Sequence, residues 1–243
     1  MHPLDGPEAL IKRAKHHLNV LDRNLRAFYK LEPCRITEEV NSDYVWYIRR
    51  IEMKPPPARL GVIAGDGVMN LRASLDHLAW QLALTQATSP FPRTEFPIIK
   101  DWNTESERRF RTVLQDVPPP AVDLIQAFQP YHSGKAAPEH GLWLLDQLCN
   151  IAKHVVIPVH GVFIDMKIPR DERIKPWMFD DGAVVLLIPI NLKPQVDLAP
   201  KPAGGVTFGY QGRVTVDPRQ LGAIYHFVAE DMLPLFARFF PKR

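Results

Sequence analysis

Apolar side chains recur every three or four residues in several stretches of the chain, which is the spacing of one buried face of an α-helix. In the first stretch the repeat consists of Leu10, Ala14, Leu18, Leu21, Leu25, Phe28 and Leu31. The same spacing returns later and predicts long helices over residues 7–31, 59–86, 142–155 and 218–240. Shorter helices are expected at about 103–114 and 120–128. Pro7 suits the first turn of the first helix, and Pro33 lies just beyond its end.

Two other regions are rich in β-branched and aromatic residues, which favour strands. In residues 34–53 the apolar run 44–48 follows the turn-forming residues 41–43, and this order predicts a hairpin. In residues 156–212 short apolar runs alternate with proline-rich sequence. We therefore expect an α+β fold that is mainly α, a helical bundle of about four long helices with a small antiparallel β-sheet excursion. The length suits a single domain over residues 1–243.

The composition limits the class of protein. Its 46% hydrophobic and 23% charged residues are ordinary for a globular chain and argue against general disorder. No apolar run reaches the length of a transmembrane helix, and residues 1–7 lack the apolar core of a signal peptide. The two cysteines, Cys34 and Cys149, fit neither a disulfide framework nor a metal knuckle. We expect a cytoplasmic protein with no membrane partner, no metal site and no cofactor.

The formal net charge of +3 permits an acidic partner such as nucleic acid without requiring one. Much of the positive charge lies in the first predicted helix, on Lys12, Arg13, Lys15, Arg23, Arg26 and Lys30. This basic surface is either a solvated helix face or a surface that contacts phosphates.

Polar side chains form a stripe beside the leucines of the second and third long predicted helices. In the second helix the stripe consists of Asn70, Ser74, His77 and Gln81, and in the third of Asp146, Asn150, Lys153 and His154. Buried polar groups need partners, so the two stripes can face each other if the helices pack together. His77 would then meet Asp146, Asn150, Lys153 or His154. The result is either a hydrogen-bonded network that only stabilises the bundle, or a cleft with histidine acid–base chemistry.

Arg72 lies within the second predicted helix but outside its polar stripe. Asp76 follows it by four residues, so an ion pair within the helix is its simplest interaction. His77 follows it by five residues, which places the two side chains about 140° apart on an ideal helix. They could meet at one ligand only through a distorted helix or a site completed by a partner subunit.

The segment Arg72-Ala73-Ser74-Leu75-Asp76-His77, with four residues between arginine and histidine, resembles the motif of the HEPN superfamily. The resemblance implies a helical bundle, commonly homodimeric, and metal-independent ribonuclease activity of the kind found in toxin and phage-defence systems. It also implies that Arg72 would hold the phosphate and His77 would act on the ribose 2′-hydroxyl, giving a 2′,3′-cyclic phosphate. Ala73 stands where the family often has a polar residue. Residues 70–77 and 150–154 also resemble segments of uncharacterised bacterial proteins, which imply no function.

The leading hypothesis from the sequence is a HEPN-like, metal-independent endoribonuclease that forms a homodimer and has RNA, not DNA, as its partner. His77 would be the general base, and Arg72 and Lys153 would stabilise phosphate charge. Asn150 and His154 would orient the substrate or protonate the leaving oxygen. The supporting residues would be Asn70, Ser74, Asp76 and Asp146. The alternatives are a non-catalytic helical binding module and an enzyme that acts on a small molecule in the bundle cleft.

Overall fold

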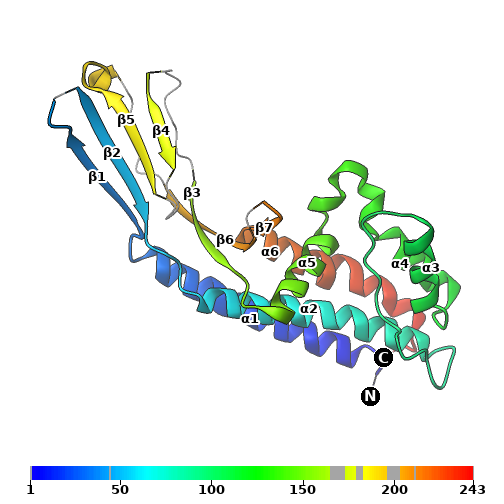
Figure 1. Cartoon of the computed structure of the whole chain (residues 1–243). Helices are drawn as coiled ribbons and strands as arrows, with labels where there is room; N and C mark the ends of the chain where they lie inside the picture. The colour runs from blue at the N-terminus through cyan, green and yellow to red at the C-terminus, as the bar shows by residue number, and fades with distance from the viewer. Residues whose placement is uncertain are drawn as a thin grey trace. The chain divides into compact units, whose positions relative to one another are not determined.

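The computed structural model describes residues 2–43, 45–164, 173–178, 183–195, 203–210 and 212–242 (Figure 1). The fold is α+β and mainly helical, with small antiparallel sheets, as the sequence predicts. Contacts divide the chain into two compact units. One comprises Met1–Asp22, Ala58–Pro158 and Phe208–Arg243, and the other comprises Arg23–Pro57 and Val159–Thr207. The expectation of a single domain stays a prediction.

The first three long helices lie close to their predicted positions. They are α1 (Asp5–Tyr29), α2 (Arg59–Ala83) and α5 (Gly141–His154). Between them lie two short helices, α3 (Thr104–Val113) and α4 (Pro119–Ala127), and the 3₁₀ segment η1 (Pro130–Glu139). None of the helices in the described ranges combines the length and the apolar character that crossing a membrane requires.

The last predicted helix, 218–240, differs from the expectation. Only α6 (Pro218–His226) is α-helical, and it continues as a π-helical turn, η3 (Phe227–Met232), and a 3₁₀ segment, η4 (Leu233–Phe239). Pro234 has no backbone N–H, so the carbonyl of Glu230, four residues earlier, cannot receive its α-helical hydrogen bond. The chain adopts other helical hydrogen-bonding patterns around this position. The fourth long α-helix of the predicted bundle is therefore much shorter than expected.

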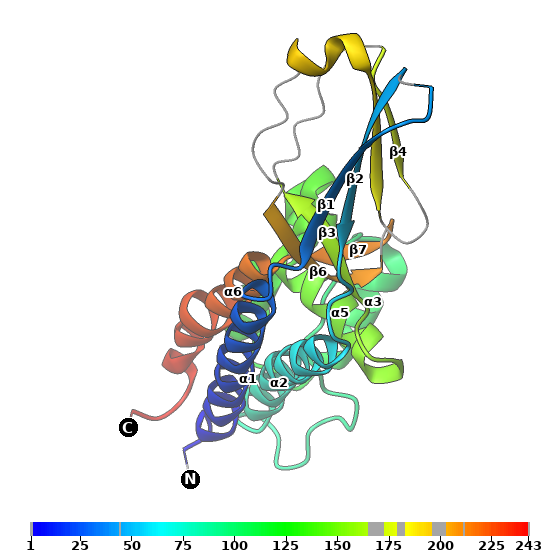
Figure 2. The ribbon, with the colours of Figure 1, turned by 90° about the vertical axis from the view of Figure 1, so that its left-hand side faces the viewer.

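Close packing of α2 against its neighbours forms the core of the first unit. A Cβ atom built on Gly65 would lie 3.5 Å from the Cβ of Ala152 on α5, and one built on Gly67 would lie 3.4 Å from Leu18 on α1. Figure 2 shows α2 running beside the first part of α1. The buried side chains of α2 include Leu60, Leu71, Leu75, Leu78 and Leu82. Each buried leucine contributes about 1.5–3 kcal/mol relative to an exposed one.

The second unit contains a four-stranded antiparallel sheet in the order β1-β2-β5-β4. The strands are β1 (Cys34–Val40), β2 (Trp46–Met53), β4 (Lys175–Met178) and β5 (Val184–Pro189). The pairing of β1 with β2 confirms the hairpin predicted at 34–53, of which Tyr44 lies outside the described residues. The 3₁₀ segment η2 (Ile190–Gln195) follows β5. An apolar cluster includes side chains of β2 and β5 and two residues outside the strands, and it consists of Tyr47, Ile174, Val184, Leu186, Ile188 and Leu192.

A three-stranded sheet has the order β3-β6-β7, with β3 at Val159–Ile164, β6 at Ala203–Tyr210 and β7 at Val214–Val216. The end of β6 pairs with β7 in antiparallel register, Phe208 opposite Val216. The sheets therefore cover parts of the predicted β region 156–212. Residues 165–172, 179–182, 196–202 and 211 of that region lie outside the described residues.

Candidate functional site

Arg72 lies in the middle of α2 and is buried, with 9% of its side chain exposed. Its Nη1 donates to Asp76 Oδ1 at 2.5 Å, and its Nη2 donates to the backbone oxygen of Phe96 at 2.9 Å. Its Nε lies 3.7 Å from Asp146 Oδ1 on α5. One guanidinium group therefore connects α2, α5 and the segment that follows α2.

Asp76 completes this connection. Its Oδ1 also accepts a hydrogen bond from the backbone N–H of Phe96 at 3.0 Å. Burial raises the pKa of Asp76, while the positive charge of Arg72 and the Phe96 hydrogen bond act in the opposite direction. The ion pair that the sequence predicts between Arg72 and Asp76 is confirmed, but it is half-buried and bound to backbone instead of lying free on the surface.

The polar stripes of α2 and α5 meet only in part. Arg72, rather than the predicted His77, is the residue of α2 that the structure places against Asp146. Asn150 donates to Asp146 Oδ2 at 3.1 Å. Ser74 and Asn70 donate to backbone oxygens of their own helix, those of Leu71 and Asp66, as polar side chains within helices often do. The contact between Arg72 and Asp146 joins the two helices, and the other hydrogen bonds satisfy polar groups within a single helix.

His77 lies on another side of α2 and is exposed. A Cβ atom built on Gly6, in the first turns of α1, would lie 3.6 Å from its Nδ1. Within one chain the structure does not bring His77 to the guanidinium of Arg72, as the 140° separation on a helix leads us to expect. Lys153 and His154 are exposed in the last turn of α5, where positive charge interacts favourably with the helix dipole.

Cys149 lies beside this charged cluster but is not an activated thiol. It is buried, and its Sγ lies 3.2 Å from the sulfur of Met69. Burial raises the pKa of Cys149, the charges of Lys153 and Arg72 lower it, and Asp146 and Asp76 raise it. The thiol therefore stays protonated near neutral pH, so Cys149 is a poor nucleophile.

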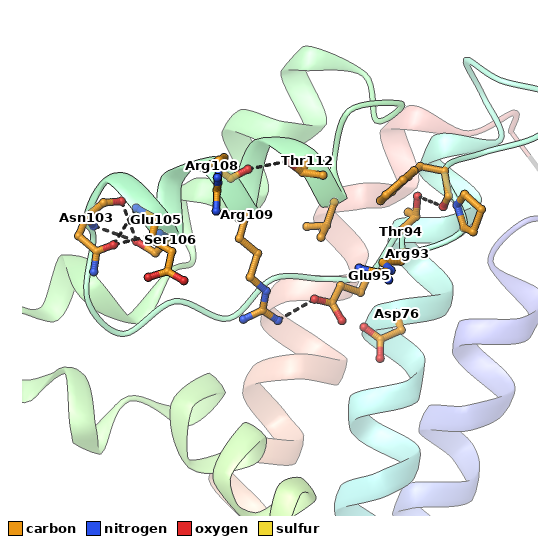
Figure 3. A pocket seen from close by; sticks show the side chains of 13 residues that line it. Asp76, Arg93, Thr94, Glu95, Asn103, Glu105, Ser106, Arg108, Arg109 and Thr112 are labelled. Carbon is orange, nitrogen blue, oxygen red and sulfur yellow. Dashed lines mark hydrogen bonds and ion pairs between the residues drawn. The ribbon is translucent and has the colours of Figure 1, made fainter.

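A groove of about 920 Å³ adjoins Asp76 and was not predicted from the sequence (Figure 3). One wall is the segment 91–95 and the other is a polar face of α3. The side chains of α3 that line it recur at helical spacing, at Glu105, Arg108, Arg109 and Thr112. The helical spacing of the charged residues in α3 can be read from the sequence. The opposite wall of the groove, segment 91–95, is a loop, and no periodic pattern in the sequence identifies it.

Hydrogen bonds fix both walls of the groove. The side chain of Asn103 accepts from the backbone N–H groups of Glu105 and Ser106 at 3.0 Å, and the Ser106 hydroxyl accepts from Asn103 N at 2.8 Å. This capping box fixes the beginning of α3. In the other wall, Phe91 N donates to Asp116 Oδ2 at 2.7 Å. The hydrogen bonds of Arg72 and Asp76 with the backbone of Phe96 anchor the same segment at its far end.

The charges that line the groove are only partly paired. Arg109 Nη2 lies 2.7 Å from Glu95 Oε1, and Asp76 is paired with Arg72. In the described part of the chain, Arg93 and Arg108 have no ion pair, although both line the groove and are exposed. The groove therefore offers positively charged hydrogen-bond donors to a ligand.

Among the residues that the structure describes, no group of three or more His, Cys, Asp or Glu residues is placed to hold a metal ion. The chain matches no family model, no curated protein and no solved structure with which it was compared.

Proposed function

We propose that this chain is a non-catalytic helical binding module that holds a small ligand in the groove between segment 91–95 and α3. The supporting observation is that Arg93 and Arg108 line this groove without an ion pair among the described residues. The volume of about 920 Å³ lies in the upper part of the range of small-molecule sites, roughly 300–1,000 Å³.

The cluster around Arg72 has a structural role in this proposal. Its guanidinium is buried, and each of its three nitrogens lies near an oxygen of Asp76, Phe96 or Asp146. A phosphate could reach Arg72 only by displacing these partners, which leaves the partly buried carboxylates of Asp76 and Asp146 uncompensated. The cluster instead fixes the loop wall of the groove through Phe96.

Equilibrium dialysis against a cell metabolite extract, read by mass spectrometry, tests the binding function. Thr112→Trp places a large side chain in the groove, whereas Arg111→Trp places the same side chain on α3 at a position that does not line the groove. We expect a compound that the wild type and Arg111→Trp retain and Thr112→Trp loses. Equal retention by all three proteins, or retention by none, would contradict the proposal.

The second candidate function is a HEPN-like, metal-independent endoribonuclease that acts on RNA as a homodimer. The observation that favours it is an exposed apolar face on α2, formed by Val62, Met69, Trp80 and Leu84. These residues share one side of the helix, and exposed His77 lies beside it. A second copy that covered this face would place the α2 helices of two chains together, so that residues of both chains could complete one site.

In this candidate, Arg72 binds the phosphate and His77 takes the proton of the ribose 2′-hydroxyl. The 2′-oxygen then bonds to phosphorus, the bond to the 5′-oxygen breaks, and that oxygen leaves with a proton. Lys153, His154 and Asn150 would supply charge, the proton and orientation. The cytoplasmic location and the toxin or phage-defence setting belong to the same proposal.

Incubation with labelled RNA in the presence of EDTA tests this candidate. We expect fragments with 2′,3′-cyclic phosphate ends from the wild type and from His226→Ala, and none from His77→Ala. His226 is an exposed histidine on α6 and serves as the control. Equal cleavage by His77→Ala would exclude the assigned base, and a monomeric wild type in light scattering would exclude the shared site.

A further inference from the structure

We infer that the groove binds a phosphomonoester with a planar apolar body, such as a nucleoside 5′-monophosphate, and that Arg93 and Arg108 hold its phosphate. This inference rests on the proposed binding function and adds the chemistry of the ligand. It depends on which donors remain available, on the charge balance and on the apolar part of the lining.

The available donors follow from the hydrogen bonds of the groove residues. The side-chain oxygen of Asn103 and the hydroxyl group of Ser106 are engaged in the capping box of α3. The hydroxyl groups of Thr94 and Thr112 donate to the backbone oxygens of Phe91 and Arg108, at 2.7 and 2.8 Å. With these groups engaged, the guanidinium groups are the charged donors that a ligand can use, beside the amide nitrogen of Asn103, which has no hydrogen bond among the described residues.

The charged side chains of the groove indicate the charge of the ligand that it would bind. The carboxylates of Asp76 and Glu95 are matched by Arg72 and Arg109. The charged groups of the groove without an ion pair in the described ranges are then two arginines, Arg93 and Arg108, and one carboxylate, Glu105. The lining as a whole is balanced, with three arginines against Asp76, Glu95 and Glu105, but the groups without an ion pair carry a net charge of +1, which favours an anion. A phosphomonoester carries a charge of about −1.5 to −2 near neutral pH.

The geometry of the donors favours phosphate over carboxylate. A guanidinium is planar and can donate two parallel hydrogen bonds to an oxyanion. The three terminal oxygens of a phosphomonoester can serve two arginines together, whereas the two oxygens of a carboxylate are filled by one such contact. Two open arginines from opposite walls therefore fit a phosphate better than a single carboxylate.

The remaining lining is apolar and lies in the same groove. Phe91, Pro92 and Val113 contribute an aromatic ring, a pyrrolidine ring and a branched aliphatic side chain. Such surfaces pack well against a flat, weakly polar group. The groove volume of about 920 Å³ also leaves room beyond the phosphate for a nucleoside-sized body.

Calorimetric titration with AMP, adenosine, 4-nitrophenyl phosphate and inorganic phosphate tests the inference on the full chain. We expect AMP to bind, and adenosine and inorganic phosphate each to bind at least about tenfold more weakly. Arg93→Ala and Arg108→Ala should each weaken AMP binding about tenfold or more, since each removes a charge-assisted contact. Arg108→Lys, which keeps the charge but loses the paired donors, should fall between wild type and Arg108→Ala.

Arg111→Ala is the matched control because it removes the same charge from α3 outside the groove. It should leave AMP affinity within about twofold of wild type. Equal affinity for AMP and adenosine, no effect of Arg93→Ala and Arg108→Ala beyond the control, or no binding of either phosphomonoester would overturn the inference. The dialysis experiment separates this inference from the proposed binding function. If Thr112→Trp lost an unphosphorylated metabolite that the wild type retains, the binding function would stand but the phosphomonoester would not be its ligand. If Thr112→Trp changed the retention of no compound, the binding function and the phosphomonoester inference would both fail.

Discussion

Arg72 and Asp76 together bind both backbone groups of Phe96. The arginine donates to the Phe96 carbonyl at 2.9 Å, and the aspartate accepts from the Phe96 N–H at 3.0 Å. The two side chains lie one helical turn apart and are bonded to each other through Nη1 and Oδ1. This arrangement fixes an otherwise irregular segment to α2, and the segment supplies one wall of the groove.

We predict that Arg72→Ala lowers the free energy of unfolding by about 3 kcal/mol, because it leaves the partly buried carboxylates of Asp76 and Asp146 without their positive partner. Urea denaturation measures the loss. Arg111→Ala is the control, since Arg111 pairs with Glu107 at the same i,i+4 spacing but is 78% exposed. The control should lose no more than about 0.5 kcal/mol. A loss for Arg72→Ala as small as the control's would contradict the structural role of Arg72.

Two glycines should respond in opposite directions to alanine. Gly209 has φ of 116°, and a Cβ atom there would lie 2.2 Å from the backbone oxygen of Val214. Gly209→Ala should therefore destabilise the protein by about 2 kcal/mol or more. Gly222 lies within α6 with open space around its Cβ position, so Gly222→Ala should stabilise it by about 1 kcal/mol. Thermal unfolding of both variants provides the comparison, and a shift of the same sign in both would refute it.

The stability should fall as the pH drops below the ordinary histidine pKa of about 6.5. Burial lowers the pKa of His140, whose Nδ1 accepts a hydrogen bond from Leu142 N at 3.2 Å at the beginning of α5. Burial also lowers the pKa of His17, although nearby Asp66 opposes this effect. For both histidines the unfolded chain binds protons more readily than the folded chain. The stabilising contribution is therefore fully present above pH 6.5 and is lost as the pH falls toward the folded pKa values.

The free energy of unfolding is measured at a series of pH values from about 7.5 to about 5, the range in which histidine titrates. These values give the slope of stability against pH. His140→Asn keeps a side-chain cap but removes one titrating group, so its slope should be shallower than that of wild type. An unchanged slope would show that His140 does not contribute.

Asn103→Ala should weaken both α3 and ligand binding. The Asn103 side chain accepts two backbone hydrogen bonds at the beginning of the helix, so its removal should cost about 1 kcal/mol of stability. The first turn of α3 carries Glu105 and leads to Arg108, so looser capping should also lower AMP affinity. Asn103→Asp can retain the cap and should preserve stability. Equal stability of Asn103→Ala and wild type in urea would contradict the capping role.

The sequence determined those features that depend on neighbours along the chain. The apolar repeat placed α1, α2 and α5 within a few residues of their observed ends, because helical spacing is local. The run of β-forming residues placed the β1–β2 hairpin in the same way. The ion pair between Arg72 and Asp76 was also predictable, since four residues make one helical turn.

Only the tertiary structure decided which polar groups meet across the fold. Arg72 contacts Phe96 and Asp146, which lie far from it in the sequence. His77 follows Arg72 by only five residues, but it lies beside Gly6 instead. The groove likewise joins a loop to α3, and no periodic pattern marks that pairing. The reason is geometric: each residue turns a helical side chain by about 100°, so the partner of a polar group depends on how whole elements pack together.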